Sequence, residues 1–169
     1  MLLQSSQTSR RVARSGAIGY DYHEMTHEYE GHYRAKYGAD LRLDPALAKC
    51  VHEKATDGHL TCASAFSISE KTGAGPAEVG RAADLLEIKI TQCQLGLFGH
   101  MKERRNIVEP AKQVSMALEQ AIQDRLISGK LPCKEAWEVA KRFGLSKIEI
   151  TGACERLNIR LGPCQLGTF

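Results

Sequence analysis

Apolar residues recur at helical spacing through two stretches of this chain, 45–98 and 115–169. In both stretches three helical segments are separated by turn residues, and a β-branched run follows the third. The predicted helices cover about 45–55, 62–72 and from Pro76 onward in the first stretch, and about 115–127, 133–143 and from just after Ser146 in the second. The β-branched runs at 88–91 and 159–161 are predicted strands.

The two stretches are similar to one another in sequence. The tetrapeptide Cys-Gln-Leu-Gly occurs at 93–96 and again at 164–167, which is an offset of 71 residues. At that offset, twelve of the 37 residues in 62–98 are identical to their counterparts without any gap. Such self-similarity is typical of a duplicated structural unit. The sequence therefore predicts a mainly α-helical protein with short β-strands, built from tandem copies over 44–98 and 114–169.

Three segments lie outside the copies. Residues 1–20 contain Arg10, Arg11 and Arg14 and no acidic residue, which indicates a disordered basic tail, or a transit peptide if the source is eukaryotic. Residues 21–43 are predicted to form an amphipathic helix that packs on the copies or dimerises. Its shared face carries Tyr22, Met25, Tyr29, Tyr33 and Tyr37. The polar stretch 99–113 is predicted to be a linker.

Composition is that of a soluble globular protein, with 43% hydrophobic and 25% charged residues. No apolar run approaches the ~20 residues of a membrane span, and the N-terminus has no secretory signal. We therefore expect a cytoplasmic protein that does not insert into a membrane. Without a secretion signal, the six cysteines are expected to be reduced thiols or metal ligands rather than disulfides. A net charge of +3 is compatible with nucleic-acid binding but does not require it.

The second copy resembles the helix-turn-helix family of DNA-binding domains. Ala140 is small enough for two helices to approach, and Gly144 follows four residues later at the turn. The inward-facing positions hold Val139, Phe143, Leu145, Ile150 and Ala153. In the first copy, Ser69 and Gly73 match Ala140 and Gly144, and Ala74, Val79 and Ala82 match Leu145, Ile150 and Ala153. The extended piece before the second helix and the strand after the third are similar to a truncated winged helix.

This resemblance implies a transcription regulator whose third helices lie in the DNA major groove. The implied DNA-binding residues are Arg81, Ser146, Lys147, Thr151, Arg142 and Arg156. However, the same two helices carry the acidic residues Glu78, Asp84, Glu149 and Glu155, which oppose phosphate binding. The alternative is a protein-interaction or assembly module, or a homodimer, in which the third helices are covered by the other copy or by a partner.

Four cysteines occupy equivalent places in the two copies: Cys62, Cys93, Cys133 and Cys164. Cys62 and Cys133 start the second helix, where the helix dipole is expected to lower the thiol pKa. The four could bind zinc or an iron–sulfur cluster, or act as redox pairs. The alternative is that they are small buried apolar residues kept through duplication. Cys50 and Cys154 have no counterpart and are predicted to lie in the core.

No convincing catalytic arrangement is present, so we predict that the protein is not an enzyme. His23, Glu24 and His27 match the His-Glu-x-x-His pattern of zinc proteases. The segment offers no third ligand and no cleft, so we interpret the match as a chance one or as an adventitious metal site. Gly73 and Gly75 indicate a turn before a helix rather than a phosphate-binding loop.

Overall fold

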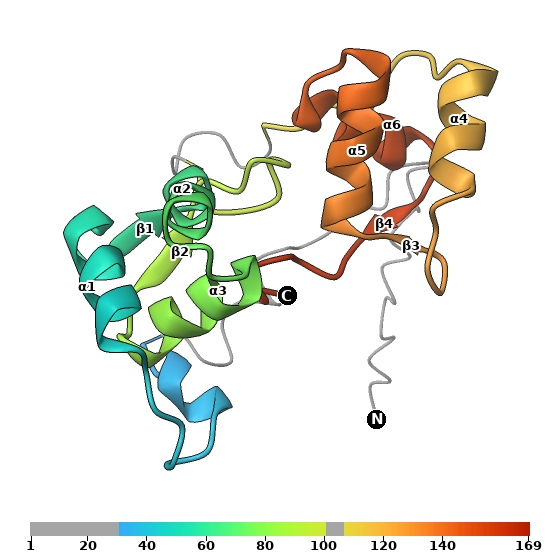
Figure 1. Ribbon diagram of the computed structural model, residues 1–169. Coiled ribbons are helices and arrows are strands. Elements are labelled where there is room, and N and C mark those ends of the chain that lie inside the picture. The colour runs from blue at the N-terminus through green and yellow to red at the C-terminus, as the bar shows by residue number, and fades with distance from the viewer. Residues whose placement is uncertain (1–30, 101–106) are drawn as a thin grey trace, which may run out of the picture.

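The computed structural model describes residues 31–100 and 107–169. This part of the chain is mainly helical with short strands, which confirms the predicted fold class (Figure 1). The N-terminal segment and first copy form η2 (Tyr33–Lys36), α1 (Pro45–Lys54), β1 (His59–Thr61), α2 (Cys62–Thr72), α3 (Pro76–Leu85) and β2 (Lys89–Thr91). The second copy forms α4 (Met116–Gln123), β3 (Lys130–Leu131), α5 (Cys133–Phe143), α6 (Lys147–Arg156) and β4 (Arg160–Leu161).

The two copies have the same backbone plan. Helices α2 and α5 begin and end at positions 71 residues apart, and so do α3 and α6. Asp57 and Ser128 are equivalent positions, and both adopt the left-handed conformation, with φ of 50° and 51°. The first helices differ more, since α1 has ten residues and α4 has eight. Helix α4 ends at Gln123, so it is shorter than the predicted helix over 115–127.

Local capping groups explain where these helices begin and end. Asp44 and Ser115 are equivalent N-caps, and their side chains accept hydrogen bonds from the first turns of α1 and α4. Gly73 and Gly144 end α2 and α5 in the left-handed conformation, with φ of 76° and 64°. A residue with a side chain would be strained at either glycine, so each turn is fixed by local sequence.

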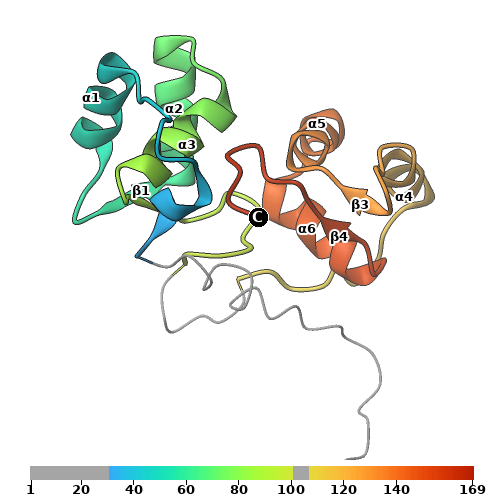
Figure 2. The same ribbon diagram turned by 90° about the horizontal axis from the view of Figure 1, so that it is seen from below.

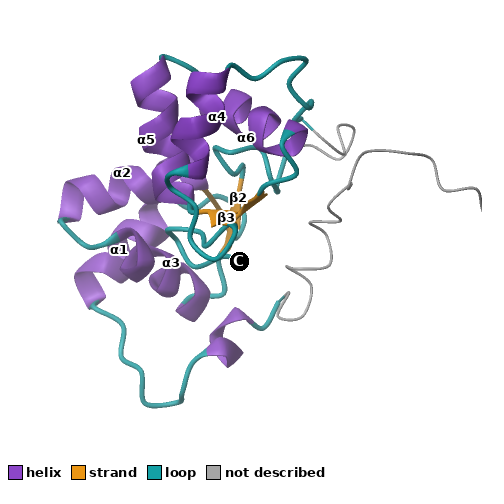
Figure 3. Cartoon of the chain, turned by 90° about the vertical axis from the view of Figure 1, so that its right-hand side faces the viewer, coloured by secondary structure: helices purple, strands orange, loops and turns teal. Residues whose placement is uncertain are grey.

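Each copy also contains a two-stranded parallel sheet. Strand β1 pairs with β2 in the register Leu60 to Ile90, and β3 pairs with β4 in the register Leu131 to Leu161. The strand after the third helix thus returns beside the extended piece before the second helix. Figure 3 shows the short strands between two groups of helices.

The segments after β2 and β4 are exchanged between the copies. Leu95 and Leu97, which follow β2, belong to the hydrophobic core of the second copy. Leu166, which follows β4, belongs to the core of the first copy. Figures 1 and 2 show the C-terminal segment running from β4 toward α3. The exchange joins two small units that would each lack part of a core alone.

The segment before α1 corrects one prediction. Within 31–43 the structure contains only the four-residue 3-10 helix η2, so the predicted helix over 21–43 does not extend through these residues. Glycines at 31 and 38 disfavour a continuous helix there. The basic tail and the His23–His27 pattern lie outside the described residues.

The predicted linker also does more than connect the copies. Residues 101–106 lie outside the described part, but the stretch after them packs on the second copy. The Ala111 N–H donates to the carbonyl of Gly152 in α6 at 2.9 Å. Side chains of Ile107 and Val108 lie against Gly96. This stretch therefore covers part of α6.

Candidate functional site at the interface between the two copies

Residues at equivalent positions meet one another at the interface. The rings of Phe66 and Trp137 have centroids 4.3 Å apart. The rings of Phe98 and Phe169 pack edge to face, with centroids 5.8 Å apart. Both pairs are separated by the repeat offset of 71 residues. A position contacts its own counterpart only near a two-fold axis, so the copies are arranged like the two subunits of a symmetric dimer.

The exchanged loops reach the middle of the third helices. The Thr151 hydroxyl in α6 donates to the Leu95 carbonyl at 2.7 Å. The equivalent position in α3 is Gly80, where an added Cβ would lie 1.8 Å from the Leu166 carbonyl oxygen. In the first copy, the backbone of Leu166 therefore packs directly on α3 at Gly80. In the second copy, the Thr151 hydroxyl fills the equivalent space. Both contacts use the helix surface that the helix-turn-helix resemblance assigns to DNA.

This packing separates the predicted DNA-binding residues from one another. Thr151 is fully buried. Lys147 is half-buried, and its ammonium lies 3.2 Å from the centroid of the Trp137 ring. Ser146 is exposed, but its hydroxyl accepts the Glu149 N–H as the N-cap of α6. Of the other three, Arg142 and Arg156 are exposed, and Arg81 is half-buried. The six residues do not form one free face.

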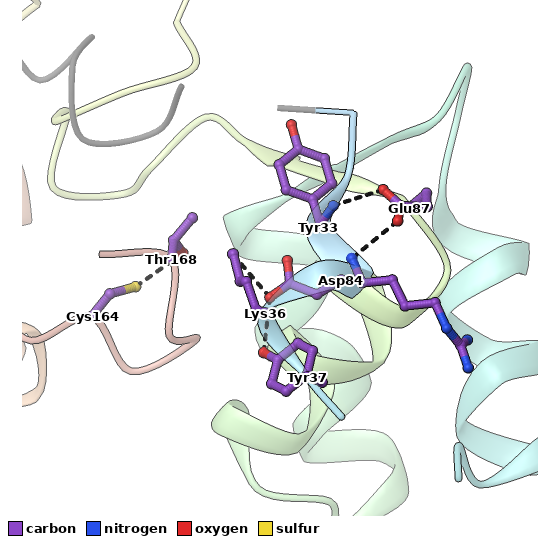
Figure 4. A network of polar contacts seen from close by, with 8 residues as sticks. Tyr33, Lys36, Tyr37, Asp84, Glu87, Cys164 and Thr168 are labelled. Atoms are coloured by element: carbon purple, nitrogen blue, oxygen red, sulfur yellow. Dashed lines mark hydrogen bonds and ion pairs between the residues drawn. The ribbon is translucent and has the colours of Figure 1, made fainter. Parts of the chain in front are cut away.

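The 31–43 segment covers α3 from another side. Asp84 is only 8% exposed and accepts hydrogen bonds from the Lys36 ammonium at 3.1 Å and the Tyr37 hydroxyl at 2.9 Å (Figure 4). The Glu87 carboxylate accepts the backbone N–H groups of Tyr33 and Arg34. Burial, reinforced by Asp84, raises the pKa of Tyr37 to about 12. This polar network ties the segment to the C-terminal half of α3.

The four repeated cysteines gather at the interface, where all are free thiols. The Gln94 amide donates to Cys62 Sγ at 3.8 Å, and the equivalent Gln165 amide donates to Cys133 Sγ at 3.5 Å. Cys164 Sγ lies 3.3 Å from the Thr168 hydroxyl. Cys62 and Cys133 are each close enough to Cys164 for the charged forms to repel. Thiols from both copies therefore lie near one another.

The predicted lowering of the pKa of Cys62 and Cys133 is wrong. Burial raises the pKa of both thiols, and the hydrogen bonds from the glutamines offset only part of this effect. Burial also raises the pKa of Cys93 to about 12. Desolvation therefore outweighs the helix dipole, and these thiols are held in the neutral form.

The predicted metal site is not formed by the described residues. Within 31–100 and 107–169, no three His, Cys, Asp or Glu side chains are placed so that they could hold a metal ion. Of the two cysteines without counterparts, Cys154 is buried as predicted, and Cys50 is half-buried against the first core. Metal binding and redox pairing by the four repeated cysteines therefore stay predictions.

Raised thiol pKa values predict how stability changes with pH. A thiol whose pKa is higher in the folded protein than the ordinary 9.0 keeps its proton when the unfolded chain has lost it. The free energy of unfolding is therefore expected to fall as pH rises from about 9 toward 12. Urea unfolding with a reductant, at pH 7.5 and 9.5, measures this. The fall should be smaller in Cys93→Ala, and an equal fall in both proteins would contradict the assignment to Cys93.

Sequence reasoning did not identify the glutamines as thiol partners or Trp137 as an interface residue. The repeated tetrapeptide was the available signal for Gln94 and Gln165, since both follow a repeated cysteine. The signal for the aromatic pair was that one repeat position holds an aromatic residue in both copies, Phe66 in the first and Trp137 in the second. Neither signal indicates by itself that the two copies touch.

Comparison with known protein families, with curated proteins and with solved structures finds no match to this chain. Among the described residues, every helix is too short or too polar to cross a membrane.

Proposed function

We propose that this chain is a cytoplasmic protein-interaction or assembly module in which the third helices serve the internal interface instead of reading DNA. The burial of Thr151 beneath Leu95 carries the proposal. A helix that reads the major groove needs free side chains along the surface that these contacts occupy. The equivalent surface of α3 is closed by Leu166.

A face of α4 is the surface we propose for the partner. Met116 and Ile127 are 87% and 62% exposed and are the large apolar residues exposed in the described part of the chain. Gln120 and Gln123 of α4 are also exposed, and Ile127 lies four residues beyond the end of this helix, where its backbone pairs with Lys130. We call Met116, Gln120, Gln123 and Ile127 the α4 face. Exposed apolar side chains on an otherwise polar surface favour contact with another protein.

The first copy provides a matched comparison. Its equivalent positions hold Pro45, Lys49, His52 and Thr56, which are exposed but contain no large apolar side chain. Lys49 is paired there with Glu53 at 3.9 Å. Helices α1 and α4 begin at equivalent positions but have ten and eight residues, so they differ in length as well as in surface chemistry. This asymmetry supports a partner that recognises the second copy.

Site-specific photo-crosslinking in cells of the source organism tests the α4 face. A photoreactive residue at position 116 or 127 is expected to give a discrete protein adduct, because a docked partner would lie within reach of these side chains. The same residue at position 45 or 56 is the control and is expected to give none. Equal labelling from the two sets, or no adduct from any position, would contradict the proposal.

A DNA titration tests the competing function. The full chain is expected to bind mixed genomic DNA weakly at low salt and without sequence preference. Tight binding that weakens steeply with salt, and that is lost when Arg142 and Arg156 are replaced by Ala, would overturn the proposal in favour of a DNA-binding regulator. Arg142 and Arg156 are suitable for this test because both are exposed.

A further inference from the structure

A hollow of about 480 Å³ lies at the turn between α5 and α6. Its polar lining includes Gln94, Lys141 and Lys147, and its apolar lining includes Trp137, Leu145 and Ile148. Gln94 comes from the first copy and the other lining residues come from the second, so the hollow lies at the junction of the two copies. Its volume falls in the ~300–1,000 Å³ range of small-molecule sites. A second hollow, of about 540 Å³, is lined only by residues of the segment 34–43 and therefore does not lie between the two copies.

The polar groups at the hollow favour an acidic ligand. The Lys147 ammonium lies over the Trp137 ring and also donates to the Gln94 side-chain carbonyl. Lys141 adds a second cation from the last turn of α5. The hollow also lies at the start of α6, where the helix dipole is positive and where Ser146 and Glu149 cap the first turn. Glu70 of α2 lies near Lys147, and the Glu149 carboxylate accepts the Ser146 N–H at the start of α6. Neither carboxylate belongs to a residue that lines the hollow, whereas both lysines line it.

Trp137 contributes an aromatic side chain to the lining of the hollow. Its indole Nε1 is buried and has no hydrogen-bond partner among the described residues. A buried N–H without an acceptor is costly, and such groups call for an explanation. An acceptor for this N–H would have to lie in the plane of the ring at its buried edge, so the N–H does not point to a ligand in the hollow. The same residue offers an aromatic surface for an apolar group.

The first copy lacks this combination at the equivalent place. There Lys141 is replaced by Glu70, Lys147 by Pro76 and Trp137 by Phe66. The first copy therefore has one negative charge where the second has two positive charges, and it has no indole. Two copies with the same backbone differ in the groups that an anion would contact. The chemistry at the hollow thus belongs to the second copy and does not follow from the shared fold.

We propose that this hollow binds a small molecule with one acidic group, a carboxylate or a phosphate, on a flat apolar body. The acidic group contacts Lys147 and Lys141 near the start of α6. The apolar body lies against Trp137, Leu145 and Ile148. Because Gln94 directly precedes Leu95 in the exchanged loop, a ligand that draws Lys147 away from Gln94 acts on the contact between the copies. This inference does not depend on the partner proposed for the α4 face.

Trp137 makes the proposal measurable, since it is the only tryptophan in the chain. The full-length protein is titrated with phenyl phosphate, with benzoate and with benzyl alcohol while tryptophan emission is recorded. At least one acid is expected to give a saturable change, and the neutral alcohol is expected to give none. Comparison of the two acids distinguishes a phosphate ligand from a carboxylate ligand. No saturable change with either acid, or an equal change with the alcohol, would overturn the proposal.

Two variants and a control sharpen the test. Lys141→Glu introduces the residue of the first copy at an exposed position, and Lys147→Met removes the half-buried cation. Each is expected to weaken binding of the acid by about tenfold or more, which corresponds to loss of a charge-assisted contact. Lys130→Glu, on β3, makes the same charge change outside the hollow and is expected to leave affinity within about twofold. If Lys147→Met does not fold, Lys141→Glu decides, and unchanged affinity there would contradict the site.

Discussion

Replacing Gly80 by Ala is expected to destabilise the protein by about 3 kcal/mol or more. The added Cβ would lie 1.8 Å from the Leu166 carbonyl oxygen and 2.7 Å from its carbonyl carbon. The obstacle is backbone, so a side-chain rotation cannot relieve the overlap. The exchanged C-terminal loop would have to leave α3, and the first core would lose Leu166. Urea unfolding followed by circular dichroism measures the loss.

Gly75→Ala is the matched control for this substitution. Gly75 has φ of −63°, which any residue adopts, and its added Cβ would lie 3.5 Å from the Glu78 carboxylate. Loss of an N-cap glycine costs at most about 1 kcal/mol. A similar, small effect of Gly75→Ala and Gly80→Ala would show that the Leu166 loop does not pack on α3 in solution.

The second large effect is expected from Leu95→Ala. Leu95 is 1% exposed and lies in the core of the second copy, although it belongs to the first copy in sequence. Truncation of a buried leucine costs about 2–5 kcal/mol because it removes buried surface and leaves a cavity. Hydrogen exchange should therefore increase in α5 and α6 more than in α2 and α3. Mass spectrometry of peptides from each copy measures this difference.

Leu166→Ala is the reciprocal experiment. Leu166 occupies the equivalent position and lies in the first core, so its truncation is expected to increase exchange in α2 and α3. The two variants should therefore give mirror-image exchange patterns. If each variant affected only the copy that contains it in sequence, the loops would not be exchanged in solution.

The parts of the fold that local sequence encodes were predicted well. Helices α2 and α5 have the predicted bounds, because Gly73 and Gly144 end them. Helix α6 begins where Ser146 caps it. The segment 31–43 was predicted less well, since the spacing of Tyr33 and Tyr37 also fits a short 3-10 turn packed on α3. Periodicity alone does not distinguish a long helix from side chains held by tertiary contacts.

The surroundings of the predicted site residues depended on the tertiary structure much more than the helix bounds did. Lys147 and Thr151 occupy positions that would face DNA in an isolated helix-turn-helix. In this protein Thr151 is buried and Lys147 is engaged with Trp137 and Gln94. A lowered thiol pKa was predicted from the helix dipole at Cys62, but burial of Cys62 in the first core raises this pKa instead. For Thr151 and Lys147, a contacting group that decides the outcome comes from the other half of the chain, Leu95 and Gln94 respectively.

The sequence by itself determined a mainly helical chain, its division into two similar units and the turns that end their helices. These features depend on groups a few residues apart, such as an N-cap and the N–H groups that it accepts. Only the tertiary structure decided that the loops cross over and that the third helices are covered. The two copies carry the same Cys-Gln-Leu-Gly segment. This segment can therefore place its leucine in the core of its own copy or in the core of the other copy, and the pattern of apolar residues is the same in both cases. Contacts across the two-fold axis decide between these two arrangements. These contacts join residues far apart in the chain, so they cannot be predicted from the order of the residues.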